Sequence, residues 1–182
     1  MSVIETIRHR AAICGHVTDA QSGAPIGGAL VSLVQPPRDT RTRADGFYFF
    51  TDLEDGHYAL QVSAPALGSR YGTAIAATVA VGSDGKGSPL LDPRGELALP
   101  STRLSGTVSR SSDGTPVAFA QVLLPASGIR TLSDKVGHYQ LGAIEAGAQR
   151  VQVTATGFTS FNGTVTLLAG QALANDIAMT PL

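Results

Sequence analysis

The chain has 182 residues, with 13 Lys and Arg against 14 Asp and Glu and a single cysteine. This balanced charge argues against nucleic acid and anionic membranes as partners, because contacts with phosphate need a basic face. One cysteine excludes an internal disulfide framework and a thiolate-rich metal site. The 21 Gly and 10 Pro in a chain with only 15% charged residues predict many turns and few long helices.

The first 12 residues precede the patterned part of the chain, and we expect residues 1–12 to form an N-terminal extension. Arg8, His9 and Arg10 stand where a secretory signal peptide would be purely apolar. No apolar run in the chain approaches the roughly 18 residues that a membrane-spanning helix needs. We therefore expect a cytoplasmic protein without membrane insertion.

An internal repeat organises the rest of the chain. Residues 15–67 align with residues 106–158 without a gap, and the identities fall on turn glycines and alternating apolar positions. The identical pairs include Gly15/Gly106, Gly23/Gly114, Pro25/Pro116, Gly46/Gly137 and Tyr48/Tyr139. We therefore predict two copies of one unit, over residues 13–100 and 103–182, joined near the LPST segment at residues 99–102.

Within each copy, apolar residues alternate with polar ones. In the first copy the alternating apolar positions are Val17, Ala29, Val31, Leu33, Tyr48, Phe50, Tyr58, Leu60 and Val62. This period of two is typical of antiparallel strands with one face turned to a core. Turn residues recur too closely to leave room for a long helix between the strands. The pattern predicts a mainly β chain.

Two Asp-Gly turns are expected in the first copy, at Asp45-Gly46 and Asp55-Gly56. Both glycines are predicted to have a positive φ, a conformation that is costly for residues with a Cβ. We therefore expect the substitution Gly56→Val to destabilise the first copy by more than about 1 kcal/mol.

The spacing of these residues resembles that of the carboxypeptidase regulatory-like domain. The matching positions in the first copy are Gly15, Val17, Asp19, Gly23, Pro25, Ala29, Val31, Thr42, Asp45, Gly46, Tyr48, Gly56, Tyr58, Leu60 and Val62. The second copy matches more weakly, because Arg110 replaces the Asp19 equivalent and Val136 stands at the position of Asp45. The resemblance implies two tandem seven-stranded transthyretin-like antiparallel β-sandwiches.

Every strongly patterned residue has a structural explanation. We assign turn or core roles to Gly15, Val17, Gly23, Pro25, Val31, Gly46, Tyr48, Gly56, Tyr58, Gly106, Gly114, Pro116, Gly137, Tyr139 and Gly147. The resemblance implies an accessory module and supplies no mechanism by itself.

Catalytic alternatives find little support. His16 and Val17 are similar to the first strand of hydroxyisourate hydrolases, which share the transthyretin-like fold, but the second copy has Thr107 at the His16 position and the family's C-terminal motif is missing. His9, His57 and His138 lack the spacing of metal ligands. We therefore expect a protein that is not an enzyme, with no catalytic, cofactor-binding or metal-binding residue. A hydroxyisourate hydrolase remains a remote alternative.

Two regions are predicted to contact a partner. Phe47 and Phe49 align with His138 and Gln140, which places both Phe on the outer face of the first copy only, where they either meet a partner or pack against the N-terminal segment or the neighbouring copy. The loop between residues 82 and 95 has no equivalent in the second copy, and such loops often carry function. Its predicted contact residues are Lys86, Leu90, Leu91 and Arg94.

These observations predict a non-catalytic structural or adaptor protein that binds other protein subunits. We expect it in a larger assembly, such as a phage-tail-like contractile particle built in the cytosol, with homo-oligomerisation as one form of assembly. The alternative is a carbohydrate-binding or ligand-binding β-sandwich module, although the chain has no Trp to stack on a sugar.

Overall fold

The computed structural model describes residues 11–72, 75–83, 89–90 and 92–182, and most of these residues lie in β-strands. The expected N-terminal extension falls outside the described residues except for its last two. The chain divides into two compact units, a first domain of Met1–Ala66 and Thr73–Leu99 and a second domain of Leu67–Gly72 and Pro100–Leu182. No helix in the described part of the chain is long and apolar enough to cross a membrane.

The first domain pairs two sheets. The strands are β1 (Ala11–Asp19), β2 (Leu30–Leu33), β3 (Arg38–Arg41), β4 (Phe47–Thr51), β5 (Gly56–Ser63), β6 (Ile75–Ser83), β7 (Pro89–Leu90) and β8 (Leu97–Leu99). One sheet has the order β4-β1-β8 and the other has the order β3-β2-β5-β6-β7. Two short 3₁₀ turns, η1 (Pro65–Leu67) and η2 (Pro93–Gly95), follow β5 and β7.

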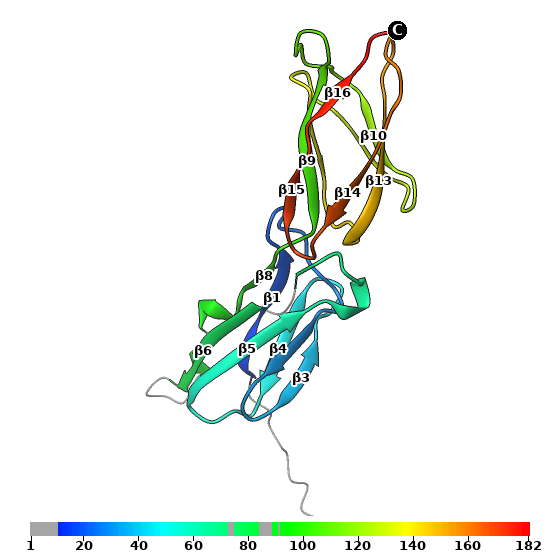
Figure 1. Ribbon diagram of the computed structural model, residues 1–182. Helices are drawn as coiled ribbons and strands as arrows, with labels where there is room; N and C mark the ends of the chain where they lie inside the picture. The colour runs from blue at the N-terminus through cyan, green and yellow to red at the C-terminus, as the bar shows by residue number, and fades with distance from the viewer. Residues whose placement is uncertain (1–10, 73–74, 84–88, 91) are drawn as a thin grey trace, which may run out of the picture. The chain divides into compact units, whose positions relative to one another are not determined.

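The second domain repeats this arrangement (Figure 1). Its strands are β9 (Arg103–Arg110), β10 (Gln121–Leu124), β11 (Ile129–Leu132), β12 (His138–Leu141), β13 (Gly147–Thr154), β14 (Phe161–Leu167), β15 (Ala172–Ala174) and β16 (Ile177–Met179). One sheet has the order β11-β10-β13-β14, and the other has the order β12-β9-β15, with β16 also paired to β9. The structure confirms a mainly β chain of two tandem domains.

The described residues form eight strands in each domain, where the resemblance implied seven. The direction of one strand pairing also departs from the prediction. The last strand of each domain pairs with the first strand in parallel, so that Val17 lies opposite Leu97 and Val108 lies opposite Ile177. The prediction of wholly antiparallel sandwiches was therefore wrong at this edge. Alternation of apolar residues reports which face of a strand is buried and carries no information about the direction of its neighbour.

The alternation of apolar and polar residues does predict which side chains lie in the core. Tyr48 and Phe50 on β4 are buried, and so are their equivalents Tyr139 and Leu141 on β12. Each Tyr hydroxyl donates a hydrogen bond to a backbone carbonyl in front of the last strand, at 2.6 Å from Gly95 O in the first domain and 2.6 Å from Asn175 O in the second. The ring is thus buried while its polar end is satisfied, as a buried Tyr requires.

Two pairs of glycines are required by close approach of the backbone. A Cβ at Gly15 would lie 2.1 Å from Gly95 O, and a Cβ at Gly106 would lie 2.1 Å from Asn175 O. Gly46 and Gly137 both have φ of +80°, and their carbonyl oxygens accept hydrogen bonds from the first strand of the respective domain. Only glycine fits at these positions without strain.

The prediction for Gly56 was wrong. Its φ lies outside the left-handed region, because Gly56 begins β5 instead of closing a tight turn, and the nearest atom to an added Cβ is a ring carbon of Tyr58 at 3.8 Å. Tyr58 itself is half-buried, and its hydroxyl donates a hydrogen bond to Glu54 O at 2.9 Å. The equivalent glycine of the second domain, Gly147, does have a positive φ of +98°.

A buried hydroxyl holds the same turn in both domains. Thr42 Oγ1 donates a hydrogen bond to Ile26 O at 2.6 Å and accepts one from Ala29 N at 2.9 Å. Ser133 Oγ occupies the equivalent position, donating to Val117 O at 2.7 Å and accepting from Ala120 N at 2.9 Å. Each hydroxyl therefore satisfies two backbone groups that water does not reach.

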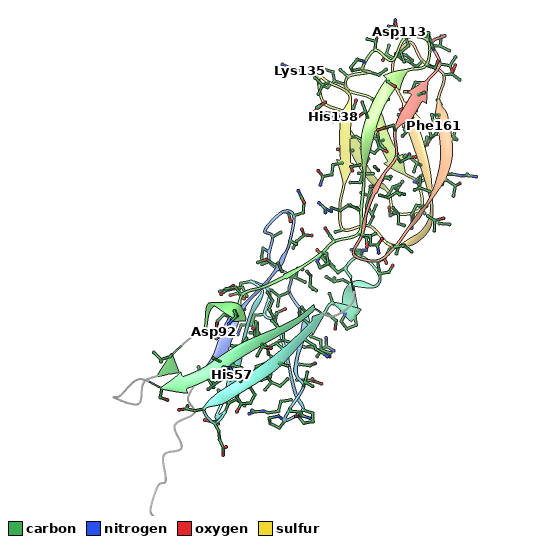
Figure 2. All side chains as sticks on the ribbon, turned by 60° about the vertical axis from the view of Figure 1, so that its left-hand side comes forward. His57, Asp92, Asp113, Lys135, His138 and Phe161 are labelled. Carbon is green, nitrogen blue, oxygen red and sulfur yellow. The ribbon has the colours of Figure 1, made fainter. Side chains whose placement is uncertain are left out.

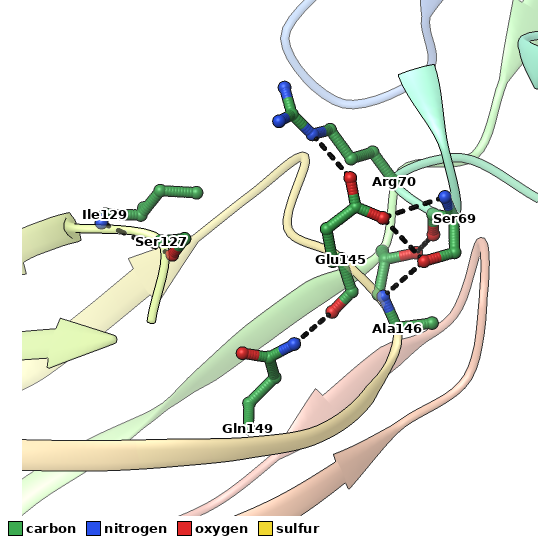
Figure 3. Close-up of polar contacts among 8 residues, drawn as sticks. Ser69, Arg70, Ser127, Ile129, Glu145, Ala146 and Gln149 are labelled. Atoms are coloured by element: carbon green, nitrogen blue, oxygen red, sulfur yellow. Dashed lines mark hydrogen bonds and ion pairs between the residues drawn. The ribbon is translucent and has the colours of Figure 1, made fainter. Parts of the chain in front are cut away.

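The second domain includes Leu67–Gly72, a segment that follows β5 in the sequence and that the repeat assigned to the first copy. Glu145 binds this segment (Figure 3). Its Oε2 accepts hydrogen bonds from the Ser69 backbone N–H at 2.8 Å and the Ser69 hydroxyl at 2.6 Å, and its Oε1 accepts one from Arg70 Nε at 3.0 Å. These bonds, that of the Ser69 hydroxyl first, lower the pKa of the Glu145 carboxyl.

Candidate outer faces of the two domains

The β1–β4 pair of the first domain carries an aromatic cluster on its outer side. His16 lies opposite Phe47, and Cys14 lies opposite Phe49. Phe49 is 40% exposed and Phe47 is half-buried, whereas Tyr48 between them is buried. The alternation that the sequence predicted for this strand is therefore confirmed, although a role of the two Phe in partner contact remains a prediction.

A cation covers the two rings. The guanidinium carbon of Arg43 lies 5.5 Å from the centre of the Phe47 ring and 5.6 Å from that of Phe49, within the range of a cation–π contact. The His16 ring lies 5.3 Å from the Phe47 ring. We call these four residues, His16, Arg43, Phe47 and Phe49, the aromatic face. Since Arg43 covers both rings, they do not form an open stacking platform for a sugar.

The second domain has a hollow at the equivalent position. It has a volume of about 410 Å³ and is lined by Ser105, Gly106, Thr107, Asp134, His138, Tyr139 and Gln140. Each lining residue aligns with a residue in or beside the aromatic face, so that His138 and Gln140 replace Phe47 and Phe49, and Asp134 replaces Arg43. We call this site the polar hollow. Figure 2 labels His138, which lines the hollow, and Lys135 on the same side of the second domain.

Asp134 also explains how the second copy keeps its turn without an Asp at the position of Asp45. In the first domain, Asp45 Oδ1 accepts a hydrogen bond from Phe47 N at 3.0 Å. In the second domain, Asp134 Oδ1 accepts bonds from Val136 N at 2.9 Å and His138 N at 2.8 Å. Asp134 Oδ2 accepts no bond within this turn and lies 4.0 Å from His138 Nδ1, and the side chain is 56% exposed.

The described residues of the loop between residues 82 and 95 include regular structure. It contains β7, which pairs with β6, and η2. Leu90 is 57% exposed, whereas Arg94 is bound within the loop by an ion pair to Asp92 at 2.6 Å. Lys86 and Leu91 lie outside the described residues. Hydrogen bonds from Arg94 and from Ala80 N lower the pKa of the Asp92 carboxyl.

The described residues include neither a cluster of metal ligands nor a thiol with a lowered pKa. No group of three or more His, Cys, Asp or Glu that could hold a metal ion exists among them. His16 Nδ1 lies 3.3 Å from Glu96 Oε1, and both side chains are exposed. Burial, with a smaller contribution from the Glu96 charge, raises the pKa of the Cys14 thiol, which disfavours the reactive thiolate.

The repeat also marks an exposed aromatic residue that the sequence analysis missed. Phe119 is 64% exposed and has φ of +58°, where the first domain has Gly28 with φ of +75°. With Phe158 it borders a hollow of about 390 Å³. The signal in the sequence was a bulky residue aligned with a glycine.

The family model of the carboxypeptidase regulatory-like domain matches residues 12–85 and, a second time, residues 103–180. The chain belongs to this family. The two matches confirm the tandem carboxypeptidase regulatory-like domains that the sequence pattern predicted. No curated protein matches the chain.

Solved structures that are similar to the chain include two pilins. The Bacillus anthracis TIE protein is 14% identical with a TM-score of 0.48, and the match covers 96% of this chain and 34% of that one. A streptococcal ancillary pilin is also 14% identical, with a TM-score of 0.39 and coverage of 96% and 62%. The shaft pilin spaA from Lactobacillus rhamnosus GG is 10% identical, with a TM-score of 0.40 and coverage of 96% and 98%.

The chain thus spans about a third of the TIE protein and less than two thirds of the ancillary pilin. Similarity at this level carries no information on activity.

Proposed function

We propose that the chain is a non-catalytic structural or adaptor subunit that works through contacts with other protein subunits. The observation that carries this proposal is the aromatic face. Phe49 remains 40% exposed, and an exposed Phe beside a stacked Arg has the composition typical of a protein interface core. The second domain keeps the same sandwich without these rings, so the fold does not need them.

The finer form of the proposal names the assembly as a phage-tail-like contractile particle built in the cytosol. The support for it is the predicted lack of catalytic chemistry and of a basic face, together with analogy to particles made of β-modules.

Native ultracentrifugation of a gentle lysate, with mass spectrometry locating the chain in the fractions, tests both forms. We expect the chain to sediment with a large complex, and a contractile particle would be identified by its other subunits. The double variant Phe47→Ser, Phe49→Ser should move the chain to light fractions without unfolding the protein. Leu132→Ser, which removes a 57% exposed side chain from the second domain, is the matched control. Wild-type chain found only as a free species would overturn the proposal.

A further inference from the structure

We propose that the aromatic face of one copy of this chain binds the polar hollow in the second domain of another copy. The inference rests on the proposed function, because it names one partner of the surface that carries that function. Its physical basis is that the two sites occupy equivalent positions on equivalent strands and differ in both shape and charge.

The shapes are complementary in kind. On the β1–β4 pair, Phe47, Phe49 and Arg43 add bulk to the outer side of the sheet. On the β9–β12 pair, the shorter or more polar replacements leave a hollow of about 410 Å³ that is open to solvent. An exposed aromatic cluster on one surface and a hollow on the other allow the close packing and exclusion of water that stabilise interfaces.

The charges are also complementary. Among the residues that the structure describes, no carboxylate forms an ion pair with Arg43, whose guanidinium stacks on two rings and is exposed. In the hollow, the aligned residue is Asp134, whose exposed Oδ2 lies outside its turn and 4.0 Å from His138 Nδ1. Asp176 adds a second carboxylate beside the hollow, where its Oδ1 accepts a hydrogen bond from Thr107 N at 2.8 Å. An Arg guanidinium binds a carboxylate through charge-assisted hydrogen bonds.

Each site also carries one charge of the other sign. Glu96 stands beside His16 on the aromatic face, and Lys135 follows Asp134 at the hollow. In a contact between the two sites, Glu96 and Lys135 can form a second pair of opposite charge.

The proposed contact is heterologous, since it joins two different surfaces of the same chain. Each copy that binds through its first domain leaves its own hollow free for a further copy, and each occupied hollow leaves an aromatic face free. Such a contact builds rows or rings of subunits instead of closed dimers of two identical faces.

Two charge-reversal variants test this geometry. Arg43→Asp destroys the aromatic face and leaves the hollow intact, whereas Asp134→Arg destroys the hollow and leaves the aromatic face intact. Each variant alone is expected to be monomeric in sedimentation velocity, with self-association at least about tenfold weaker than wild type. An equimolar mixture is expected to associate again, because the intact aromatic face of one variant meets the intact hollow of the other and the two reversed charges are themselves opposite in sign. Wild-type association should grow with protein concentration and weaken with salt.

Matched controls separate this result from general effects of charge. Arg41→Asp reverses a nearby exposed Arg, and Asp113→Arg reverses an Asp that also caps a turn, through its bond from Thr115 N at 3.0 Å. Both controls should associate as wild type does. If Asp134→Arg fails to fold, Asp134→Asn keeps the turn acceptor and removes the charge.

Three results would overturn the inference: a wild-type chain that stays monomeric at all concentrations, variants that still associate alone, or a mixture that stays monomeric. A purified chain that stays monomeric but sediments with other proteins in a lysate would overturn this inference alone and leave the proposed function standing. A chain that is free in both experiments would overturn both.

Discussion

On the outer side of the first domain stand Phe47 and Phe49, whereas the equivalent strand of the second domain carries His138 and Gln140. The strands that carry these residues have the same core side in both domains. In each domain a buried Tyr hydroxyl donates a hydrogen bond to a backbone carbonyl at 2.6 Å. The two domains therefore share a framework and differ in surface. Residues identical in both copies serve the sandwich, and residues that differ are where a function can reside.

The largest loss of stability is expected from substitutions at the glycines that both domains share in their first strands. Gly15→Ala and Gly106→Ala each place a Cβ 2.1 Å from a backbone oxygen that belongs to the same rigid framework. We expect each substitution to lower the free energy of unfolding of its own domain by about 3 kcal/mol or more. Hydrogen exchange resolved by peptide will assign the loss to a domain. Equal loss in both domains from one substitution would contradict the independence of the two frameworks.

A smaller effect is expected at the buried hydroxyls. Thr42→Val and Ser133→Ala each leave one backbone N–H and one carbonyl without their partner in a buried turn. The cost should be about 1–3 kcal/mol in the domain that carries the change. Chemical denaturation of each variant measures it, with Thr42→Ser as the control that keeps the hydroxyl. A variant as stable as wild type would show that water replaces the hydroxyl.

Gly56 and Gly147 are aligned by the repeat, but substitutions at the two positions are expected to differ in their effect on stability. Gly147→Ala forces a residue with a Cβ into φ of +98° and should cost about 1 kcal/mol. Gly56→Ala should change stability by no more than about 0.5 kcal/mol, because its φ is ordinary and its surroundings are open. Thermal melts of the two variants decide the matter. If Gly56→Ala lowered the melting temperature more than Gly147→Ala does, the tight turn that the sequence predicted at Gly56 would be supported after all.

The smallest effect concerns Glu145, since its carboxylate is 40% exposed. Its pKa is lowered by Ser69 and Arg70, so its contribution to folding is fully present above the ordinary value of 4.5 and is lost as pH falls through the lower folded value. Glu145→Gln should therefore reduce the loss of stability of the second domain below pH 4.5. Melting temperatures at a series of pH values measure this difference, and parallel curves for variant and wild type would contradict it.

Several of these features were predictable because they depend on neighbours in the chain. The period of two gives the buried face of β4, with Tyr48 and Phe50 inward, and glycine after Asp at Gly46 gives its positive φ. The same logic failed at Gly56, where the chain enters a strand directly after Asp. Nothing local distinguishes the two Asp-Gly pairs, and the pairing of β5 with β6 decides between them.

The sequence by itself determined the family, the two-copy organisation, the mainly β fold and the faces of the strands, because periodicity and turn residues act over a few positions. Only the tertiary structure decided the parallel pairing of the last strand, the assignment of Leu67–Gly72 to the second domain, the stacking of Arg43 on two rings and the turn held by Asp134. These contacts depend on strand register and loop path, which bring together groups whose separation in the sequence has no period to reveal them.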